Sequence, residues 1–292
     1  MLQSCWPNRA CESWSAHHLH FQISNLFVTS VAKNGHAESL SAAGLEELIK
    51  HHPLGRPLVG VVFYNNGESV PLLLARFPRW SGIDVVFHDD ASSDGTPEIL
   101  EQSGFTVLRQ TVNGGLGRAI KNIIEHAHKT NHQVVVIMAG NNKDDPNEVP
   151  RLLAPIYQDD KDYVQGSRML QGGSSPSIPL FRRLMVPAHA LMMSGFTGFR
   201  CTDALNGFRA YKTGLFYENP KFNIWQEWLD HYELETYIHY NVLRRGYRVA
   251  EVPVTKSYAH FKDGMKHSHI RPFQDWWGIL RPLLFLWLGI RK

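Results

Sequence analysis

From Leu58 onward, short apolar runs alternate with amphipathic segments. The runs are rich in Val and Ile and predict buried strands over residues 58–64, 83–88, 105–110, 133–138 and 162–167. The segments between them have apolar residues at helical spacing and predict helices over residues 69–77, 96–103, 115–129 and 147–157. This alternation is typical of βαβ units, so the pattern predicts an α/β fold with a mostly parallel sheet and helices on both faces.

After residue 177 the pattern predicts helices over 179–196 and 230–245, a short extended stretch over 203–211, and a strand over 247–255. We expect residues 57–270 to form the folded domain. Residues 1–56 are expected to be a weakly ordered N-terminal extension, with helix signals at 39–49. Residues 271–292 are expected to be a C-terminal amphipathic segment.

Tryptophans and arginines in the C-terminal segment suit a helix that lies in the plane of a membrane interface. The alternative is an ordinary helix that packs on the sheet. The apolar run of the C-terminal segment, residues 282–290, is far shorter than the roughly 20 residues that a helix needs to cross a bilayer. We see no signal-peptide pattern, and the three cysteines, Cys5, Cys11 and Cys201, fit a reducing compartment. We therefore expect a cytoplasmic protein, peripheral on the cytoplasmic face of a membrane.

Composition excludes some classes of function. The 292 residues are 43% apolar, enough for a sizeable core, and a net charge of +3 does not indicate a nucleic-acid partner. The 16 histidines form no HExxH pattern and no paired CxxC occurs, so a zinc site has little support. NGGLGRA (113–119) lacks the third glycine of a dinucleotide fingerprint and follows the third strand, so we discount NAD; Walker A and GxSxG patterns are absent.

Polar residues cluster directly after the predicted strands. Because the carboxyl ends of parallel strands meet at one edge of a sheet, these clusters predict a pocket for a nucleotide-type ligand. Each loop alone is also consistent with ordinary turn chemistry. The five clusters are Asn65, Asn66 and Glu68; Asp89, Asp90 and Asp94; Asn113 to Gly117; Asn141 to Asp145; and Gly166, Ser167 and Arg168.

Seven motifs resemble, in order, those of family 2 glycosyltransferases with the GT-A fold. FHDDASSDGT is similar to the VDDGSxDGT segment of that family, and VIMAGNNKDDPNEVPRLL is similar to its metal loop, usually of DADGQxDP type. The other five are VVFYNNGES, NGGLGRAIKNII, YVQGSRM, DALNGFRAY and YELETYIHYNVLRRGYRVAEVPV. The resemblance covers roughly residues 57–270 and is nearest to the polyprenyl- and dolichyl-phosphate sugar transferases, including phosphomannose synthases.

The resemblance implies an inverting enzyme that moves one sugar from a nucleotide-sugar donor to a polyprenyl or dolichyl phosphate. The QxxRW motif of processive synthases is absent, so one sugar per cycle is expected. A lipid phosphate is already an anion near neutral pH and needs little general-base help; the protein positions the reactants and stabilises the departing diphosphate. Two alternatives stay open: a soluble glycosyltransferase with a non-lipid acceptor, and a non-catalytic homologue that binds a sugar nucleotide.

The resemblance also implies two groups of binding residues. Those for the nucleotide-sugar donor are Asn65, Asp89, Asp90, Asp94, Gly115 and Lys121. Those for the acceptor or its phosphate are Ser167, Asp203, Arg209, Lys262 and Lys266, with Arg168 beside them because a planar guanidinium binds an oxyanion through two hydrogen bonds. Simpler roles remain for some: helix capping for Asp94, a surface salt bridge for Arg168, structure for Arg209, and a solvated basic tail for Lys262 and Lys266.

A carboxylate on the predicted helix 230–245 is expected beside the donor. Glu233 and Glu235 compete for this role, and residues two apart cannot share one helical face. We favour Glu235.

The loop after the fourth strand departs from the family pattern. Asp-x-Asp-x-Gln, whose oxygens hold magnesium or manganese on the diphosphate, aligns with Ala139, Asn141 and Lys143. Because an ammonium would be repelled by a divalent cation, we interpret Lys143 as a partial substitute for the metal. The rival interpretation is a shifted metal on Asp144 and Asp145, and the simplest is a solvated Lys143. The metal cofactor therefore stays open, and the expected catalytic set is Asn141, Lys143, Asp144, Asp145, Arg168 and Glu235.

Overall fold

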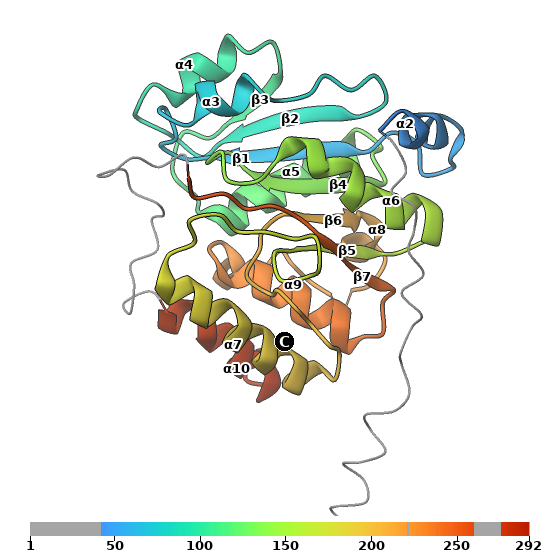
Figure 1. Ribbon diagram of the computed structural model, residues 1–292, viewed down its shortest axis with the longest axis vertical. Coiled ribbons are helices and arrows are strands. Elements are labelled where there is room, and N and C mark those ends of the chain that lie inside the picture. Colours follow the sequence, from blue (N-terminus) through green and yellow to red (C-terminus); the bar gives the residue numbers. More distant parts are fainter. Residues whose placement is uncertain (1–41, 221, 260–275, 292) are drawn as a thin grey trace, which may run out of the picture. The chain divides into compact units, whose positions relative to one another are not determined.

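The computed structural model describes residues 42–220, 222–259 and 276–291 (Figure 1). Seven strands form one sheet in the order β3-β2-β1-β4-β6-β5-β7. The strands are β1 (Leu58–Phe63), β2 (Asp84–Asp89), β3 (Thr106–Arg109), β4 (Val134–Ala139), β5 (Tyr163–Ser167), β6 (Arg209–Lys212) and β7 (Val249–Pro253). The helices are α2 (Ala42–His51), α3 (Val70–Leu74), α4 (Thr96–Glu101), α5 (Leu116–Lys129), α6 (Val149–Asp159), α7 (Leu180–Thr197), α8 (Gly214–Tyr217), α9 (Glu233–Arg244) and α10 (Trp276–Trp287), with 3-10 turns η1 (Pro146–Glu148) and η2 (Glu227–Leu229).

Strand β6 runs antiparallel to β4 and β5, whereas the other neighbouring strands pair in parallel. The carboxyl ends of β1, β2, β4, β5 and β7 therefore lie at one edge of the sheet, together with the loop that enters β6. This arrangement confirms the predicted α/β class with a mostly parallel sheet.

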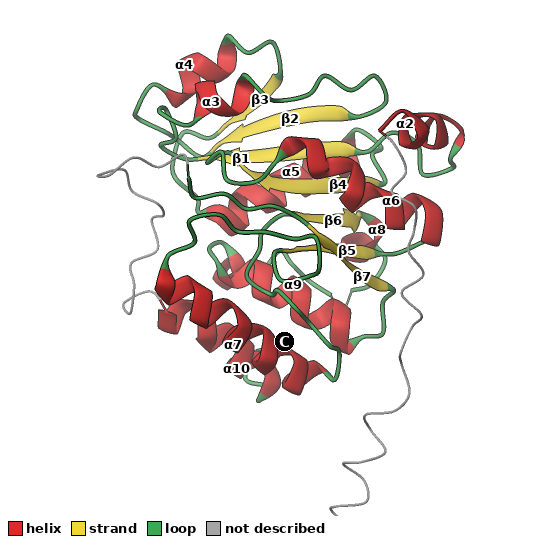
Figure 2. Ribbon diagram, viewed as in Figure 1, coloured by secondary structure: helices red, strands yellow, loops and turns green. Residues whose placement is uncertain are grey.

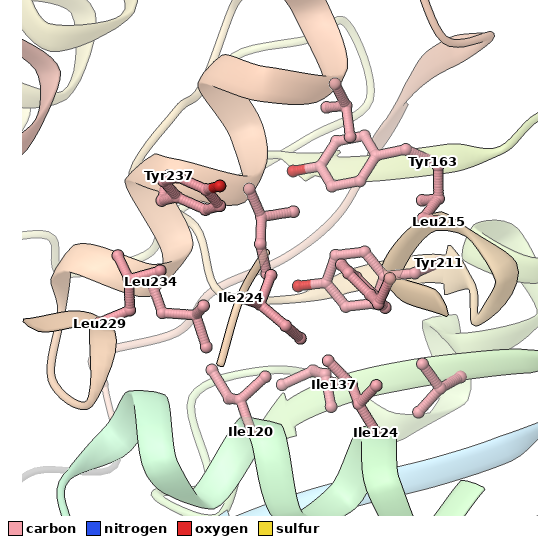
Figure 3. Close-up of a cluster of buried hydrophobic side chains, with 14 of the residues drawn as sticks. Ile120, Ile124, Ile137, Tyr163, Tyr211, Leu215, Ile224, Leu229, Leu234 and Tyr237 are labelled. Atoms are coloured by element: carbon pink, nitrogen blue, oxygen red, sulfur yellow. The ribbon is translucent and has the colours of Figure 1, made fainter. Parts of the chain in front are cut away.

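Helices cover both faces of the sheet (Figure 2). On one face, Ile120 and Ile124 of α5 pack with Ile137 of β4 and Tyr211 of β6 (Figure 3). The other face packs against α2, α3 and α6, so that β1 is buried along its whole length. Burying one such aliphatic side chain stabilises the fold by about 1.5–3 kcal/mol, which explains why the central strands read as continuous apolar runs.

The structure differs from the expectation of a weakly ordered extension over residues 1–56. Within its described part, α2 buries Leu45 and Ile49 in the core beside α6. The carbonyl of Gly55 accepts a hydrogen bond of 2.8 Å from the Tyr157 hydroxyl. Residues 42–56 therefore belong to the folded domain, because an amphipathic helix there covers one sheet face.

Helix α10 contributes to the core on one side only. Leu283 and Leu286 are buried against the cluster that contains α9, while Trp277 and Trp287 are 57% and 52% exposed. The buried side agrees with an ordinary packed helix, although it packs on α9 and not on the sheet, and contact of the exposed side with a membrane stays a prediction. Within the described parts of the chain, we find no helix with the length and apolar character needed to cross a bilayer.

Candidate active site

The loops after β1 and β2 hold each other by hydrogen bonds. The Asn65 N–H donates to Ser92 Oγ at 2.9 Å, and Asp94 accepts from the Gly67 N–H at 2.8 Å and from the Thr96 hydroxyl at 2.6 Å. Burial acts to raise the pKa of Asp94, but these hydrogen bonds bring it below its ordinary value. Asp94 therefore joins the two loops beside the start of α4, where Gly95 is the N-cap residue.

Asp89 and Asp90 are both buried at the end of β2, yet their partners differ. The two carboxylate oxygens of Asp90 accept from the N–H groups of Gly114 and Gly115, each at 2.9 Å. Asp89 Oδ2 lies 4.0 Å from Arg109 Nε, while its Oδ1 has no hydrogen-bond partner in the described part of the chain. A buried acceptor without a partner costs about 1–3 kcal/mol. Asp90 thus shapes the neighbouring loop, whereas Asp89 has one carboxylate oxygen without a partner among the described residues.

Gly115 and Lys121 both lie against other parts of the protein chain. Gly115 has a φ of 88°, and a Cβ there would lie 2.2 Å from Nδ1 of His231, so only glycine fits. The buried Lys121 ammonium donates to the Asp230 carboxylate at 2.6 Å and to the Gln226 carbonyl at 2.8 Å. The structure gives Lys121 the role of tying α5 to the segment before α9 and does not support the expected contact with the donor.

Arg76 braces the loop after β4. Its Nε donates to Asn142 Oδ1 at 2.8 Å, its Nη2 donates to the Asp144 carbonyl at 2.7 Å, and its Nη1 lies 3.3 Å from Asp145 Oδ1. The same Asp145 oxygen accepts the N–H of Asn147 at 3.0 Å and begins η1. The Asp145 carboxylate is therefore paired with the Arg76 guanidinium and caps the start of η1.

Asp144 is fully buried and is paired with Lys256. The Lys256 ammonium lies 2.7 and 2.9 Å from the two carboxylate oxygens, and it also donates to Asn206 Oδ1 at 3.2 Å. Hence both carboxylates expected as shifted metal ligands, Asp144 and Asp145, bind protein cations instead. Over the described residues, no cluster of three or more His, Cys, Asp or Glu could hold a metal. The residues present do not fit a divalent metal held by these two carboxylates.

Lys143 is not a solvated loop residue, because it is only 4% exposed. Its N–H donates to Asn141 Oδ1 at 3.3 Å, and its ammonium lies 5.1 Å from the centre of the Tyr258 ring. Burial, followed by the positive charges of Lys256 and Arg182, lowers the pKa of Lys143 to about 7. The loop after β4 therefore presents a lysine in a predominantly cationic environment.

Arg168 and Asp203 form a buried bidentate ion pair. Nε and Nη2 of Arg168 donate to the two carboxylate oxygens at 2.6 and 2.8 Å. Burial acts to raise the pKa of Asp203, but the charge and hydrogen bonds of Arg168 hold it below its ordinary value. Beside this pair, Ser167 Oγ lies 2.6 Å from Thr202 Oγ1. A surface salt bridge is the wrong description of Arg168, because the side chains of both partners are almost completely buried.

Arg209 is fully buried and has a structural role. Its Nε, Nη1 and Nη2 donate to the backbone carbonyls of Asn206, Glu235 and Ala204 at 2.7, 2.8 and 3.2 Å. Arg209 therefore ties the loop before β6 to the first turn of α9 and stiffens the wall beside the site.

Glu235 and Glu233 point to different places. Glu233 Oε1 accepts from Arg281 of α10 at 2.7 Å, whereas Glu235 lines a pocket on the other side of α9. A Cβ on Gly207 would lie 2.6 Å from Glu235 Oε1, so glycine at this position lets the carboxylate approach the loop. Glu235 therefore lies in a pocket, and its expected place beside the donor stays a prediction.

This pocket, called here the arginine pocket, has a volume of about 720 Å³, counting the part open to solvent. Arg168 and Arg182 line this pocket, and the charges of both also act on Lys143 in the loop after β4. Basic, acidic and apolar groups share its wall. The lining residues are Arg168, Phe181, Arg182, Val186, Ala204, Leu205, Arg209, Tyr232, Glu235, Thr236 and Ile279.

Four residues of this region were not among the sequence candidates: Arg76, Arg182, Lys256 and Tyr258. Lys256 directly follows the predicted strand 247–255, so the rule used for the other polar clusters could have found it. Arg76, Arg182 and Tyr258 carry no such signal and reach the site through tertiary contacts. Lys262 and Lys266 lie outside the described residues.

A mostly parallel sheet with polar loops at one edge and an arginine-lined pocket beside them agrees with a glycosyltransferase of the GT-A type. The chain belongs to glycosyl transferase family 2, whose model matches residues 58–219. It is 30% identical to an undecaprenyl-phosphate mannosyltransferase of Micrococcus luteus over 68% of this chain and 83% of that protein. It is 27% identical to the polyprenol monophosphomannose synthase of Mycolicibacterium smegmatis over 70% of this chain and 78% of that protein.

Solved structures agree with the fold. The crystal structure of glucosyl-3-phosphoglycerate synthase from Mycobacterium tuberculosis in complex with phosphoglyceric acid matches with a TM-score of 0.61. The match covers 88% of this chain and 87% of that one at 17% sequence identity, so it supports the architecture alone. The protein is a glycosyltransferase with the GT-A fold, as the sequence motifs predict.

Proposed function

We propose that this glycosyltransferase moves one sugar, with inversion, from a nucleotide-sugar donor to a polyprenyl phosphate at the cytoplasmic face of a membrane. The observation that carries the proposal is the lining of the arginine pocket, where guanidinium groups and a carboxylate stand beside apolar side chains. Such a lining suits an acceptor with a phosphate head and a hydrocarbon tail. The two relatives named above, a mannosyltransferase and a phosphomannose synthase for polyprenyl substrates, support the same acceptor class.

The outer face of α7 supports contact with a membrane surface. Leu180, Leu184 and Leu191 follow one another at helical spacing and are 72%, 65% and 74% exposed, with the exposed Arg183 among them. A helix that is apolar on its outer as well as its inner side is typical of a lipid-facing element, and basic residues suit anionic headgroups. We assign an anionic lipid bilayer as the partner of this face.

The same helix reaches the arginine pocket. Phe181 and Arg182 of α7 line it, together with Ile279 of α10. Phe196 of α7 stacks on Trp287 of α10 with ring centres 4.7 Å apart, which joins the two helices (Figure 1). An acceptor phosphate can therefore enter the pocket from this side while its hydrocarbon chain stays in the lipid.

The proposed transfer needs no external base. A phosphate oxygen of the acceptor forms a bond to the anomeric carbon as the bond from that carbon to the donor diphosphate breaks, and the electron pair leaves on the nucleoside diphosphate. The acceptor oxygen is already deprotonated near neutral pH, so the protein's contribution is to orient and to neutralise charge. In this proposal Glu235 binds the donor sugar, Asp89 binds the nucleotide, and Arg168 with Arg182 binds the acceptor phosphate.

Sugar transfer can be measured with radiolabelled GDP-mannose, UDP-glucose and UDP-N-acetylglucosamine. The full chain is incubated with vesicles that contain or lack a polyprenyl phosphate. We expect organic-extractable label from one donor, and only in the presence of the polyprenyl phosphate. Label in a water-soluble phosphorylated acceptor, with none in the lipid, would instead select the soluble alternative, and no transfer to either acceptor class would contradict the proposal.

A further inference from the structure

The loop after β4 carries an inference about how the donor's diphosphate is neutralised, and it rests on the proposed function. We infer that Lys143 and the Tyr258 hydroxyl bind the diphosphate of the donor directly, with Lys256 cancelling the charge of Asp144, so that donor binding does not require a divalent metal.

The carboxylates of this loop are occupied by protein cations. Both oxygens of Asp144 lie within 2.9 Å of the Lys256 ammonium, and Asn206 holds that ammonium from a third direction. Asp145 is held by Arg76. A metal ion would have to displace a buried ammonium from Asp144, and removing one member of a buried ion pair is strongly unfavourable.

The Lys256 position is fixed by the backbone as well as by charge. Asp144 and Lys256 form an isolated antiparallel bridge, and the Ser257 N–H donates to the Lys143 carbonyl at 2.8 Å. The segment that follows β7 therefore lies along the loop after β4. The position of Lys256 beside Asp144 is therefore set by backbone pairing as well as by the ion pair.

Among the described residues whose charge acts on Lys143, cations outnumber anions. Burial lowers the pKa of Lys143 most, Lys256, Arg182 and Arg168 lower it further, and Asp144 opposes them while bound to Lys256. A cluster of cations in a buried position is unfavourable unless an anion joins it. The loop is therefore suited to a ligand with two or more negative charges, and a nucleoside diphosphate carries them.

Tyr258 supplies a second, independent indication of a ligand. Its side chain is 1% exposed, and its hydroxyl has no hydrogen-bond partner among the residues that the structure describes. The Lys143 ammonium and the Arg182 guanidinium lie 5.1 and 6.0 Å from the centre of its ring. A buried hydroxyl usually finds a partner, and an O–H in a cationic cluster is a ready donor to a phosphate oxygen.

The proposed site adjoins the arginine pocket. Arg168 and Arg182 line that pocket and also contribute to the charge around Lys143. A diphosphate on Lys143 and Tyr258 would therefore lie next to the acceptor phosphate, and the departing group would be stabilised by fixed protein charges.

Calorimetric titration of the full chain with UDP and GDP separates this inference from the proposed function. Each titration is run once with EDTA and once with manganese. For the nucleotide that binds, we expect dissociation constants that agree within about twofold under the two conditions. Binding that is lost in EDTA and restored by manganese overturns this inference and leaves the proposed function standing. Binding of neither nucleotide under either condition overturns both.

Variants assign the contact to the diphosphate. Lys143→Gln is expected to weaken UDP or GDP by about tenfold, Tyr258→Phe by several-fold, and Lys143→Arg much less. Affinity for the matching nucleoside monophosphate should change less in each variant, because it lacks the second phosphate. Lys129→Gln on α5 is the matched control, since Lys129 is exposed and, within the described residues, forms an ion pair with Glu125 alone. Equal losses for the mono- and diphosphates, or no loss in Lys143→Gln with an unchanged melting temperature, would refute the assignment.

Discussion

The ammonium of Lys256 lies 2.7 and 2.9 Å from the two carboxylate oxygens of fully buried Asp144, although the two residues are 112 positions apart in the chain. This pair joins the loop after β4 to the segment after β7. It also determines the charge of the site, because without Lys256 the loop would carry an unpaired buried carboxylate beside Lys143. The pair therefore matters both for stability and for the ligand that the site accepts.

Asp144→Asn is expected to destabilise the protein by about 3–5 kcal/mol, because it leaves the Lys256 charge buried without a counter-ion. Chemical denaturation followed by circular dichroism measures the change. Combining it with Lys256→Met should recover part of the loss, since the second change removes the stranded charge.

Asp84→Asn is the control for this experiment. Asp84 pairs with Arg56 at 2.6 Å, but both side chains are about half exposed, at 41% and 53%. An exposed pair contributes about 0–1 kcal/mol. A loss in Asp144→Asn no larger than in this control would mean that the buried pair is not stabilising, and an additive double variant would mean that the two residues do not interact.

The affinity for a nucleoside diphosphate is expected to fall as pH rises above 7. The pKa of Lys143 is lowered to about 7 by burial first and then by the charges of Lys256, Arg182 and Arg168, with Asp144 acting in the opposite direction. A bound anion favours the protonated ammonium of Lys143. At pH values where Lys143 is neutral in the free protein, binding therefore requires that Lys143 takes up a proton. The affinity should therefore fall by up to about tenfold per pH unit above that value and level off below it.

Titration calorimetry across about pH 6 to pH 9 checks this, with Lys143→Arg as the control, because a guanidinium stays charged throughout that range. The variant should show a flatter profile than the natural protein. The same decline in both would assign the pH dependence to another group.

The sequence predicted the sheet well because its central strands are buried on both faces. Val59, Val61 and Val136 are fully buried, so each such run shows no polar interruption and no competing helical period. The helix at Leu45 and Ile49 was expected only as a signal within a weakly ordered extension. Its burial depends on a distant sheet face, which local periodicity does not report.

The site was predicted in part for the same reason. Motifs located the loops of Asp89 and Arg168, since polar residues directly after a strand are visible in one segment. A further motif located the helix that carries Glu235. The partner of each side chain was not visible. Lys256 reaches Asp144, and Asp230 reaches Lys121, across more than a hundred residues. Pairing between charges that far apart depends on the tertiary structure. The sequence alone therefore did not reveal that Lys121 pairs with Asp230, and Lys121 was expected to bind the donor.

Glu235→Gln is expected to lower sugar transfer by about a hundredfold or more, with little change in melting temperature. Its carboxylate lines the arginine pocket and has no ion pair with a described residue. Glu233→Gln is the matched control on the same helix, because Glu233 pairs with Arg281 at 2.7 Å, away from that pocket. Similar losses in the two variants would show that α9 is sensitive to any change of this kind and that Glu235 has no separate role.

Leu184→Asp and Leu191→Asp are expected to reduce binding to anionic vesicles without unfolding the protein. Both side chains are largely exposed on α7, at 65% and 74%, so neither substitution opens a core cavity. Burying one leucine in an interface contributes about 1.5–3 kcal/mol, and a carboxylate there adds repulsion from anionic headgroups. Flotation should therefore show at least about a tenfold weaker partition for each.

Val112→Asp is the control for these variants, since Val112 is 74% exposed in the loop after β3 and lies on neither α7 nor α10. Vesicle binding should be unchanged in it. Transfer to a polyprenyl phosphate in vesicles should fall in parallel with binding in the α7 variants, while the affinity for the nucleotide stays constant because the donor loops are not altered. Vesicle binding that is equal in all three variants would exclude α7 as the lipid-facing surface and would leave the arginine pocket open to a water-soluble acceptor.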